Sequence, residues 1–163
     1  MSFAIVVARF YEHLADRLVG GAQTAFADAG AGEADVFAVP GAFELPLAAR
    51  YVAQSGRYDG VACLGAVIRG ETAHFEYVCQ SVTDGLTRVA LDASTPVGHG
   101  VLTVDTIGQA RARAGLPGSA EDKGWEATIA ALATALTLRG LRTPQRATGF
   151  SASPDGVLRD GRL

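Results

Sequence analysis

The chain has 163 residues, of which 48% are hydrophobic and 19% are charged, so it can form one domain that buries roughly 70% of its unfolded surface. Its net charge of −3 argues against a general nucleic-acid binder, because no basic stripe is available to neutralise phosphates. No apolar run approaches the roughly 20 residues of a membrane-spanning helix, and the N-terminus lacks the pattern of a signal peptide. Cys63 and Cys79 have no metal-like spacing, so we expect reduced thiols and a cytoplasmic protein.

Hydrophobic periodicity predicts strands and helices in alternation. Strands are expected at residues 3–8, 35–39, 60–67 and 100–104. Helices are expected at 12–29, 43–54, 72–93 and 106–114, with a last helix that begins between 119 and 123 and runs to about 139. This order predicts an open, parallel, four-stranded α/β sheet with helices on both faces, a three-layer α/β/α arrangement. We expect one domain over 1–142 and a poorly ordered tail over 143–163, where the sequence turns polar.

Four candidate motifs follow the predicted strands, at the edge of the sheet where ligands bind in this class of fold. They are Arg9-Phe10, Pro40-Gly41-Ala42-Phe43-Glu44, Val67 to His74, and Thr103-Val104-Asp105-Thr106. Their convergence on one edge indicates a ligand site more strongly than any one of them alone. The chain has no phosphate-binding loop of the nucleotide hydrolases, no dinucleotide fingerprint and no serine-hydrolase elbow, so those chemistries are disfavoured.

The segment 64–78 is the most informative part of the chain, because a buried strand runs there into the first turn of a long helix. Gly70 lets the backbone bend or approach a ligand closely. The free N–H groups and the dipole of the helix N-terminus favour an anion, and His74 lies in that first turn. A titratable imidazole beside an anion site suits proton transfer on a phosphorylated substrate. The plainer alternative is a helix-start histidine held by hydrogen bonds.

Other side chains near these motifs also allow two interpretations. Phe10 can stack on a planar ligand or can simply pack, and Glu44 can accept from hydroxyls or a uracil-like edge or can favour its helix N-terminus. Arg113 and Lys123, the only lysine, can clamp a phosphate or can be solvated helix ends. His99 precedes a predicted strand and can equally face solvent.

Five blocks of this sequence, in order, are similar to the lumazine synthase family of riboflavin biosynthesis. The resemblance spans about residues 3–141 and is most specific in the third block. The blocks are 3–10 (FAIVVARF), 39–46 (VPGAFELP), 64–78 (LGAVIRGETAHFEYV), 96–106 and 122–124.

The resemblance implies a flavodoxin-like subunit that assembles into homopentamers, in some members twelve pentamers forming a shell. It also implies a transferase that condenses 5-amino-6-(D-ribitylamino)uracil with 3,4-dihydroxy-2-butanone 4-phosphate to 6,7-dimethyl-8-ribityllumazine. Phosphate and water are released, and no cofactor or metal is used. In this family the active site lies between neighbouring subunits.

The resemblance also assigns roles by position. Phe10 would stack on the pyrimidine, and backbone groups of Val67 and Ile68 would contact the uracil. The ribityl chain would be held by Ala42, Phe43 and Glu44. The phosphate end would be lined by Gly70, Glu71 and Thr72. His74 would be the catalytic residue that moves protons, while Arg113 of the neighbouring subunit would bind phosphate and Lys123 of that subunit would contact substrate.

Some positions depart from the family pattern. Tyr11 stands where many members have Asn, and His99 stands where many have Phe as the second aromatic wall over the heterocycle. The loop 115–123 is about two residues longer than in shell-forming members, and the N-terminal extension of those members is missing, so we expect a free pentamer. The alternatives are a non-catalytic lumazine- or flavin-binding relative, a shell-forming scaffold, and an archaeal-type riboflavin synthase.

Overall fold

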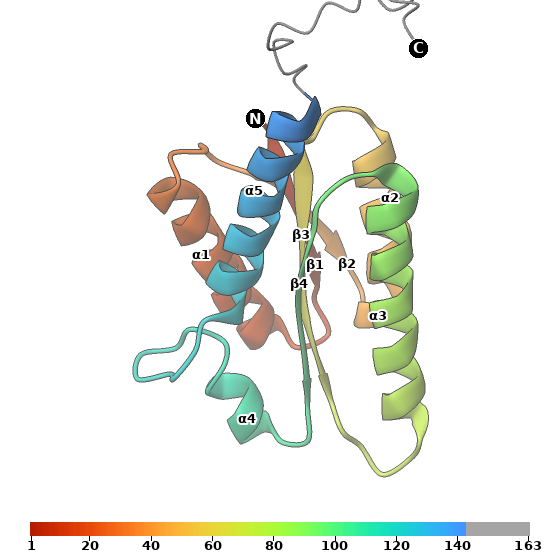
Figure 1. Ribbon diagram of the computed structural model, residues 1–163. Coiled ribbons are helices and arrows are strands. Elements are labelled where there is room, and N and C mark those ends of the chain that lie inside the picture. The colour runs from red at the N-terminus through yellow and green to blue at the C-terminus, as the bar shows by residue number, and fades with distance from the viewer. Residues whose placement is uncertain (143–163) are drawn as a thin grey trace, which may run out of the picture.

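The computed structural model describes residues 1–142 and has a four-stranded, all-parallel sheet in the order β2-β1-β3-β4 (Figure 1). The strands are β1 (Phe3–Ala8), β2 (Asp35–Val39), β3 (Gly60–Ile68) and β4 (Val97–Val104). The first crossover runs outward to β2 and the second returns past β1 to β3, so the strand order reverses beside β1, as in flavodoxin-like folds. The predicted fold class is confirmed. The predicted tail, 143–163, lies outside the described residues.

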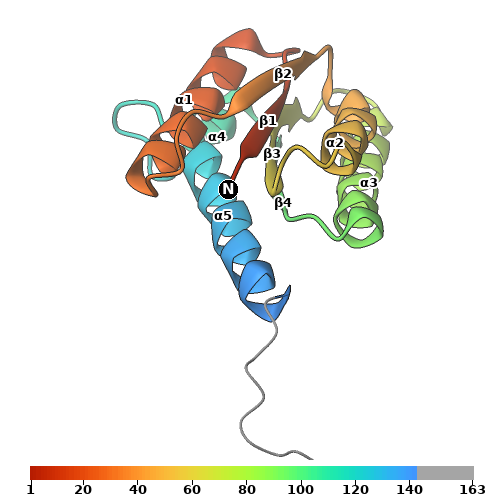
Figure 2. The ribbon, with the colours of Figure 1, turned by 90° about the horizontal axis from the view of Figure 1, so that it is seen from above.

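Helices cover both faces of this sheet (Figure 2). They are α1 (Glu12–Asp28), α2 (Leu45–Gln54), α3 (His74–Ala93), α4 (Ile107–Arg111) and α5 (Lys123–Arg142), with a single 3₁₀ turn at Ala42–Glu44. One face carries α1 and α5, the other carries α2 and α3, and α4 lies at the carboxyl edge of the strands. In the part of the chain from 1 to 142, no helix combines the length and apolarity needed to cross a membrane.

The two central strands are buried on both faces, which explains their continuous apolar sequence. All six residues of β1 are buried, and successive side chains alternate between the layers. Ile5 and Val7 belong to the core beneath α1 and α5, whereas Val6 and Cys63 belong to the core beneath α2 and α3. The sheet thus holds its carboxyl edge rigidly between two cores.

Several element boundaries differ from the prediction, and for three of them the contacts are informative. Strand β4 begins at Val97, because the pairing with β3 extends to Val61↔Val97 through a glycine-rich run of weak strand propensity. Helix α3 begins at His74, two residues late, after a bend over 71–73. Helix α4 ends at Arg111, because the following segment pairs with the residues before α5, including an Ala114↔Asp122 bridge.

Helix α5 lies unusually close to its neighbours where glycine replaces a side chain. A Cβ added at Gly124 would lie 2.1 Å from the Leu18 carbonyl oxygen of α1, and one at Gly98 would lie 2.2 Å from the Ala127 carbonyl oxygen of α5. Trp125 Nε1 also donates to Asp28 Oδ2 at 2.9 Å, at the other end of α1. These approaches fix the N-terminus of α5 against both α1 and β4.

Candidate active site

A cavity of about 300 Å³ opens at the carboxyl ends of β1 and β3, on the side of α2 and α3. We call it the histidine cavity, after His74. Its lining includes every residue of the first three motifs for which a binding or catalytic role was predicted, except Glu71. Glu71 is exposed and lines neither this cavity nor the one along β4. The lining residues are Phe10, Tyr11, Gly41, Ala42, Phe43, Glu44, Ala66, Val67, Ile68, Gly70, Thr72, His74, Phe75 and Val78.

Two open aromatic rings form part of the wall of the histidine cavity. Phe10 is 74% exposed and Phe43 is 61% exposed, although both are large apolar residues. Phe10 makes an edge-on contact with Tyr11 at 5.0 Å between ring centroids and an interplanar angle of 70°. This contact supports the Phe10 ring from one side. An aromatic ring held in this way at a cavity wall can stack on a planar heterocycle.

The turn after β2 holds the Glu44 carboxylate in a fixed direction. The Gly41 N–H donates to Glu44 Oε2 at 2.9 Å, three residues away in the chain. The other oxygen, Oε1, can therefore accept hydrogen bonds from ligand hydroxyls without a change in the turn. Pro46 lies in the first turn of α2, as predicted, where its missing N–H costs nothing.

The start of α3 provides backbone donors beside His74. Ala73 is the N-cap and makes no side-chain cap. The His74 N–H donates to Thr72 Oγ1 over a long distance of 3.4 Å. A 20-residue helix that begins without a side-chain cap leaves its dipole and part of its first turn available to an anion, although the Glu76 N–H already donates to the Ala73 carbonyl oxygen at 3.1 Å. A Cβ added at Gly70 would meet nothing within 4 Å, so the turn also leaves open space in front of these groups.

A charged cluster around Arg69 lies directly beside this turn, and the sequence analysis missed it. Arg69 Nε donates to Asp105 Oδ1 at 2.6 Å, Arg69 Nη1 pairs with Glu76 Oε1, and the guanidinium carbon lies 4.3 Å from the centroid of the Phe75 ring. Hydrogen bonding to Arg69 lowers the pKa of Glu76 from its ordinary value. Asp105 is 36 residues from Arg69 in the chain, so no local spacing could have revealed the pair.

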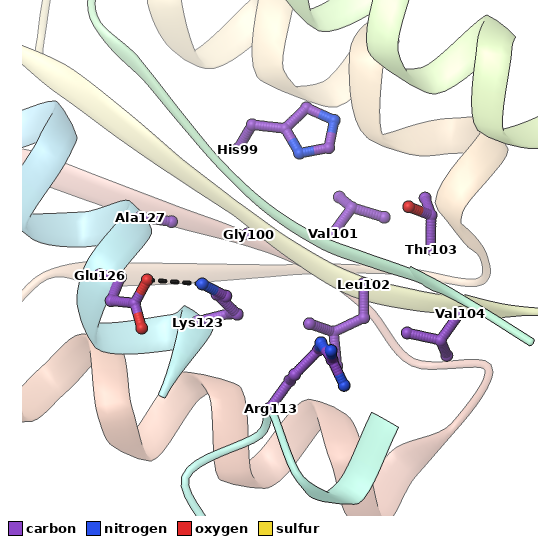
Figure 3. Close-up of a pocket in the computed structure, with 10 residues that line it drawn as sticks. All are labelled: His99, Gly100, Val101, Leu102, Thr103, Val104, Arg113, Lys123, Glu126 and Ala127. Carbon is purple, nitrogen blue, oxygen red and sulfur yellow. Dashed lines mark hydrogen bonds and ion pairs between the residues drawn. The ribbon is translucent and has the colours of Figure 1, made fainter. Parts of the chain in front are cut away.

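A second cavity, of about 520 Å³, lies along β4 and the N-terminus of α5 (Figure 3). We call it the β4-edge cavity. It contains the remaining predicted residues, His99, Arg113 and Lys123. Figure 3 shows His99 on one side of β4, while Arg113 and Lys123 lie on the other side. His99 faces α3, where its Nε2 is 3.4 Å from Thr83 Oγ1.

The two cations of the β4-edge cavity are held by different partners. Lys123 Nζ lies 2.5 Å from Glu121 Oε2 and 2.7 Å from Glu126 Oε2. The hydrogen bond to Glu121 and, to a smaller extent, the one to Glu126 raise the pKa of Lys123. The hydrogen bond between Lys123 and Glu121 also lowers the pKa of Glu121. Arg113 Nη1 donates to the Gln109 carbonyl oxygen at 3.1 Å, which leaves the rest of its guanidinium for an anion.

Apart from Glu71, the predicted site residues therefore divide between two cavities of the described chain. The histidine cavity has the aromatic wall, the fixed carboxylate and the proton-transfer candidate. The β4-edge cavity has the two cations and the second histidine.

Comparison with known proteins shows the family to which the chain belongs. The family model described as 6,7-dimethyl-8-ribityllumazine synthase matches residues 1–139. A protein of that name from Salinispora arenicola is 58% identical over 153 residues, 93% of this chain and 90% of the relative. Proteins of the same name from Saccharopolyspora erythraea and Frankia casuarinae are 54% and 57% identical, over 92% and 86% of this chain and 90% and 88% of the relatives. The chain belongs to the 6,7-dimethyl-8-ribityllumazine synthase family.

Proposed function

We propose that this protein is the transferase that condenses 5-amino-6-(D-ribitylamino)uracil with 3,4-dihydroxy-2-butanone 4-phosphate in riboflavin biosynthesis. The product is 6,7-dimethyl-8-ribityllumazine, and phosphate and water are released. One observation carries the proposal: His74 lies at the start of an uncapped helix, inside a cavity whose wall includes the open ring of Phe10. This arrangement combines a proton-transfer group, an anion site and a stacking surface.

The chemistry follows from the positions of these groups. Phe10 stacks on the pyrimidine, and Glu44 Oε1 accepts from the ribityl hydroxyls held beside Ala42 and Phe43. Backbone groups of Val67 and Ile68 bind the uracil edge, which leaves the 5-amino group near His74. The amine attacks the ketone, and His74 transfers protons as the imine forms and water leaves. Amine and ketone are reactive on their own, so orientation of the two substrates supplies much of the remaining acceleration.

Phosphate is bound at the N-terminus of α3, by N–H groups of the 70–72 turn, with Gly70, Glu71 and Thr72 at that end of the site. His74 lies beside this position and assists loss of the phosphate group by proton transfer. Arg113 of a neighbouring subunit adds a forked donor to the phosphate, and Lys123 of the same neighbour contacts the substrate. His99 occupies the position of the second aromatic wall.

The proposed assembly is a homopentamer with one active site at each subunit contact. It is supported by the division of the site residues between two cavities. It is also supported by large exposed apolar side chains on α2 and α3, which are Leu47, Tyr51, Tyr77 and Leu91. The long loop before α5 favours a free pentamer over a shell. A cytoplasmic location is supported by Cys63 and Cys79, which are free thiols.

The direct test is turnover of the two substrates by wild type and by His74→Ala, followed through lumazine absorbance. We expect wild-type turnover well above the uncatalysed rate and a loss of about 10–100-fold in the variant. An unaffected variant would leave orientation as the main contribution and remove His74 from the mechanism. Binding of lumazine without turnover would support the non-catalytic alternative. The names of the relatives, which are those of synthases, count against that alternative.

A further inference from the structure

We propose that Arg69 is a positioning residue for the phosphate end of the site, because its guanidinium fastens the start of α3 to the segment after β4. The inference rests on the proposed function and assigns a role to a residue that contacts none of the reacting atoms. Arg69 follows β3 directly and is separated from His74 by the four residues of the turn that faces the anion.

The contacts of Arg69 join three parts of the chain. Its backbone N–H donates to the Val104 carbonyl oxygen at 2.9 Å, which continues the ladder between β3 and β4 beyond the last strand residue. Its side chain donates through Nε to Asp105 and pairs through Nη1 with Glu76 in the first turn of α3. The flat guanidinium face lies on the Phe75 ring. Only arginine offers two separate donors and a stacking face from one side chain.

The segment that contains Asp105 is itself held by further hydrogen bonds. The Asp105 N–H donates to Gln109 Oε1 at 2.8 Å, and the Gln109 N–H donates to Thr106 Oγ1 at 3.1 Å. These bonds cap α4 and connect Asp105 to the short helix that precedes Arg113. Arg69 therefore fixes the position of the His74 turn relative to the segment that leads to Arg113 in the same subunit.

Arg69 also balances charge at the place where the phosphate must bind. The cluster contains two carboxylates, Glu76 and Asp105, and one guanidinium between them. Without Arg69, two uncompensated negative charges remain beside the N-terminus of α3. They would oppose the attraction between the helix dipole and a phosphate dianion. Arg69 thus supports phosphate binding by geometry and by neutralisation, and suitable variants separate the two contributions.

The test compares steady-state constants for Arg69→Met and Arg69→Lys with a matched control, Arg57→Met. Arg57 is also exposed, pairs with a carboxylate, Asp35, at 3.6 Å and lies over a neighbouring ring, Tyr58, at 5.1 Å, but it is at the opposite edge of the sheet. We expect Arg69→Met to raise KM for the butanone phosphate about tenfold and to lower kcat, with KM for the ribitylaminouracil changed less than about twofold. Arg69→Lys should recover much of the affinity for the butanone phosphate but less of kcat. Lysine restores the positive charge but not the two separate guanidinium donors.

A triple variant, Arg69→Met with Glu76→Gln and Asp105→Asn, removes all three charges. Recovery of KM for the phosphorylated substrate with kcat still low would support both contributions. Equal changes in the two KM values, no change in either, or the same changes in Arg57→Met would overturn the proposal. Thermal unfolding of each variant identifies any general loss of stability, and Arg69→Lys serves if Arg69→Met does not fold.

A binding measurement separates this proposal from the proposed function. Inorganic phosphate is titrated into wild type and Arg69→Met, and binding is followed by phosphorus NMR at low and at moderate salt. Weaker binding in the variant supports the role of Arg69, and equal binding overturns it, whether or not the wild type turns over the two substrates. Absence of wild-type turnover counts against the proposed function alone.

Discussion

The histidine cavity and the β4-edge cavity differ in what forms their walls. The histidine cavity is formed by backbone turns after three strands and by aromatic rings, and its one fixed carboxylate is held by its own turn. The β4-edge cavity lies along the outermost strand and depends on long cationic side chains, one of which is paired with two glutamates.

This difference indicates how the two sets of groups keep their positions. Groups of the histidine cavity follow strand ends that are fixed by the sheet and its two cores, and Glu44 and the start of α3 are held further by the Gly41 N–H and by Arg69. Lys123 at the start of α5 and Arg113 after α4 are half-buried, and their directions depend on ion pairs and a carbonyl contact that water and salt weaken. The groups of the histidine cavity are thus held mainly by backbone structure, whereas the cations of the β4-edge cavity are held by side-chain contacts.

The largest expected effect tests whether the two cavities serve one site across two subunits. His74→Asn and Arg113→Met should each reduce turnover by about 10–100-fold. Co-expressed as mixed oligomers, they should regain about one quarter of wild-type turnover, because random pairing joins one intact half from each subunit in that fraction of contacts. A mixture no more active than its components would place both residues in the site of one subunit.

The next effect concerns the backbone that supports the β4-edge cavity. Gly98→Ala should destabilise the protein by about 1–3 kcal/mol, because its Cβ would overlap the Ala127 carbonyl oxygen of α5 and force the helix outward. Gly20→Ala is the control: it is exposed in α1, has nothing within 4 Å of its added Cβ, and should stabilise by about 0.5–1 kcal/mol. Urea unfolding measures both, and equal stabilities of the two variants would contradict the close approach.

A smaller effect is expected from the aromatic wall of the histidine cavity. Phe10→Ala should raise KM for the ribitylaminouracil about five- to tenfold, which corresponds to the loss of one stacking contact. KM for the butanone phosphate should change little, and Phe10→Tyr should behave like wild type. If Phe10→Ala left both constants unchanged, the ring would have a packing role only.

The smallest effect is the response of the β4-edge cavity to acid. Because Lys123 holds the Glu121 pKa below its ordinary value of 4.5, this ion pair stabilises the folded protein above that value. The contribution is lost as the pH falls through the lower, folded-state pKa. Thermal unfolding should therefore show a small difference between wild type and Glu121→Gln at neutral pH that disappears in acid. A difference that grew in acid would contradict the pairing.

The elements that determine this fold were predictable because their signals are local. The short apolar runs at 3–8 and 60–67 suit strands covered on both faces, and the helix that ends at Asp28 has a regular period of buried residues. The start of β4 was missed because Gly98 and Gly100 have weak strand propensity but are required by the close packing of α5 and of Leu64.

The candidate site was predicted in its members more than in its arrangement. Motifs after parallel strands must converge, so the lining of the histidine cavity followed from strand order. The Arg69 cluster could not be found, because the pairing of Arg69 with Asp105 depends on the relative positions of β3 and β4 rather than on spacing along the chain. His99 and Lys123 lie on opposite sides of β4. This could not be predicted, because the expected strand began at residue 100, whereas His99 lies within β4 and its side chain faces one side of the sheet by strand alternation.

The bond between Trp125 and Asp28 gives the protein a built-in optical reporter. Trp125 is the only tryptophan in the chain, and its indole lies two residues after Lys123. Its emission therefore comes from a single place, the junction of α1 with the N-terminus of α5. Separation of the two helices exposes the indole to water and shifts the emission to longer wavelength. Fluorescence during unfolding can thus follow the packing of α5 against α1 without any label.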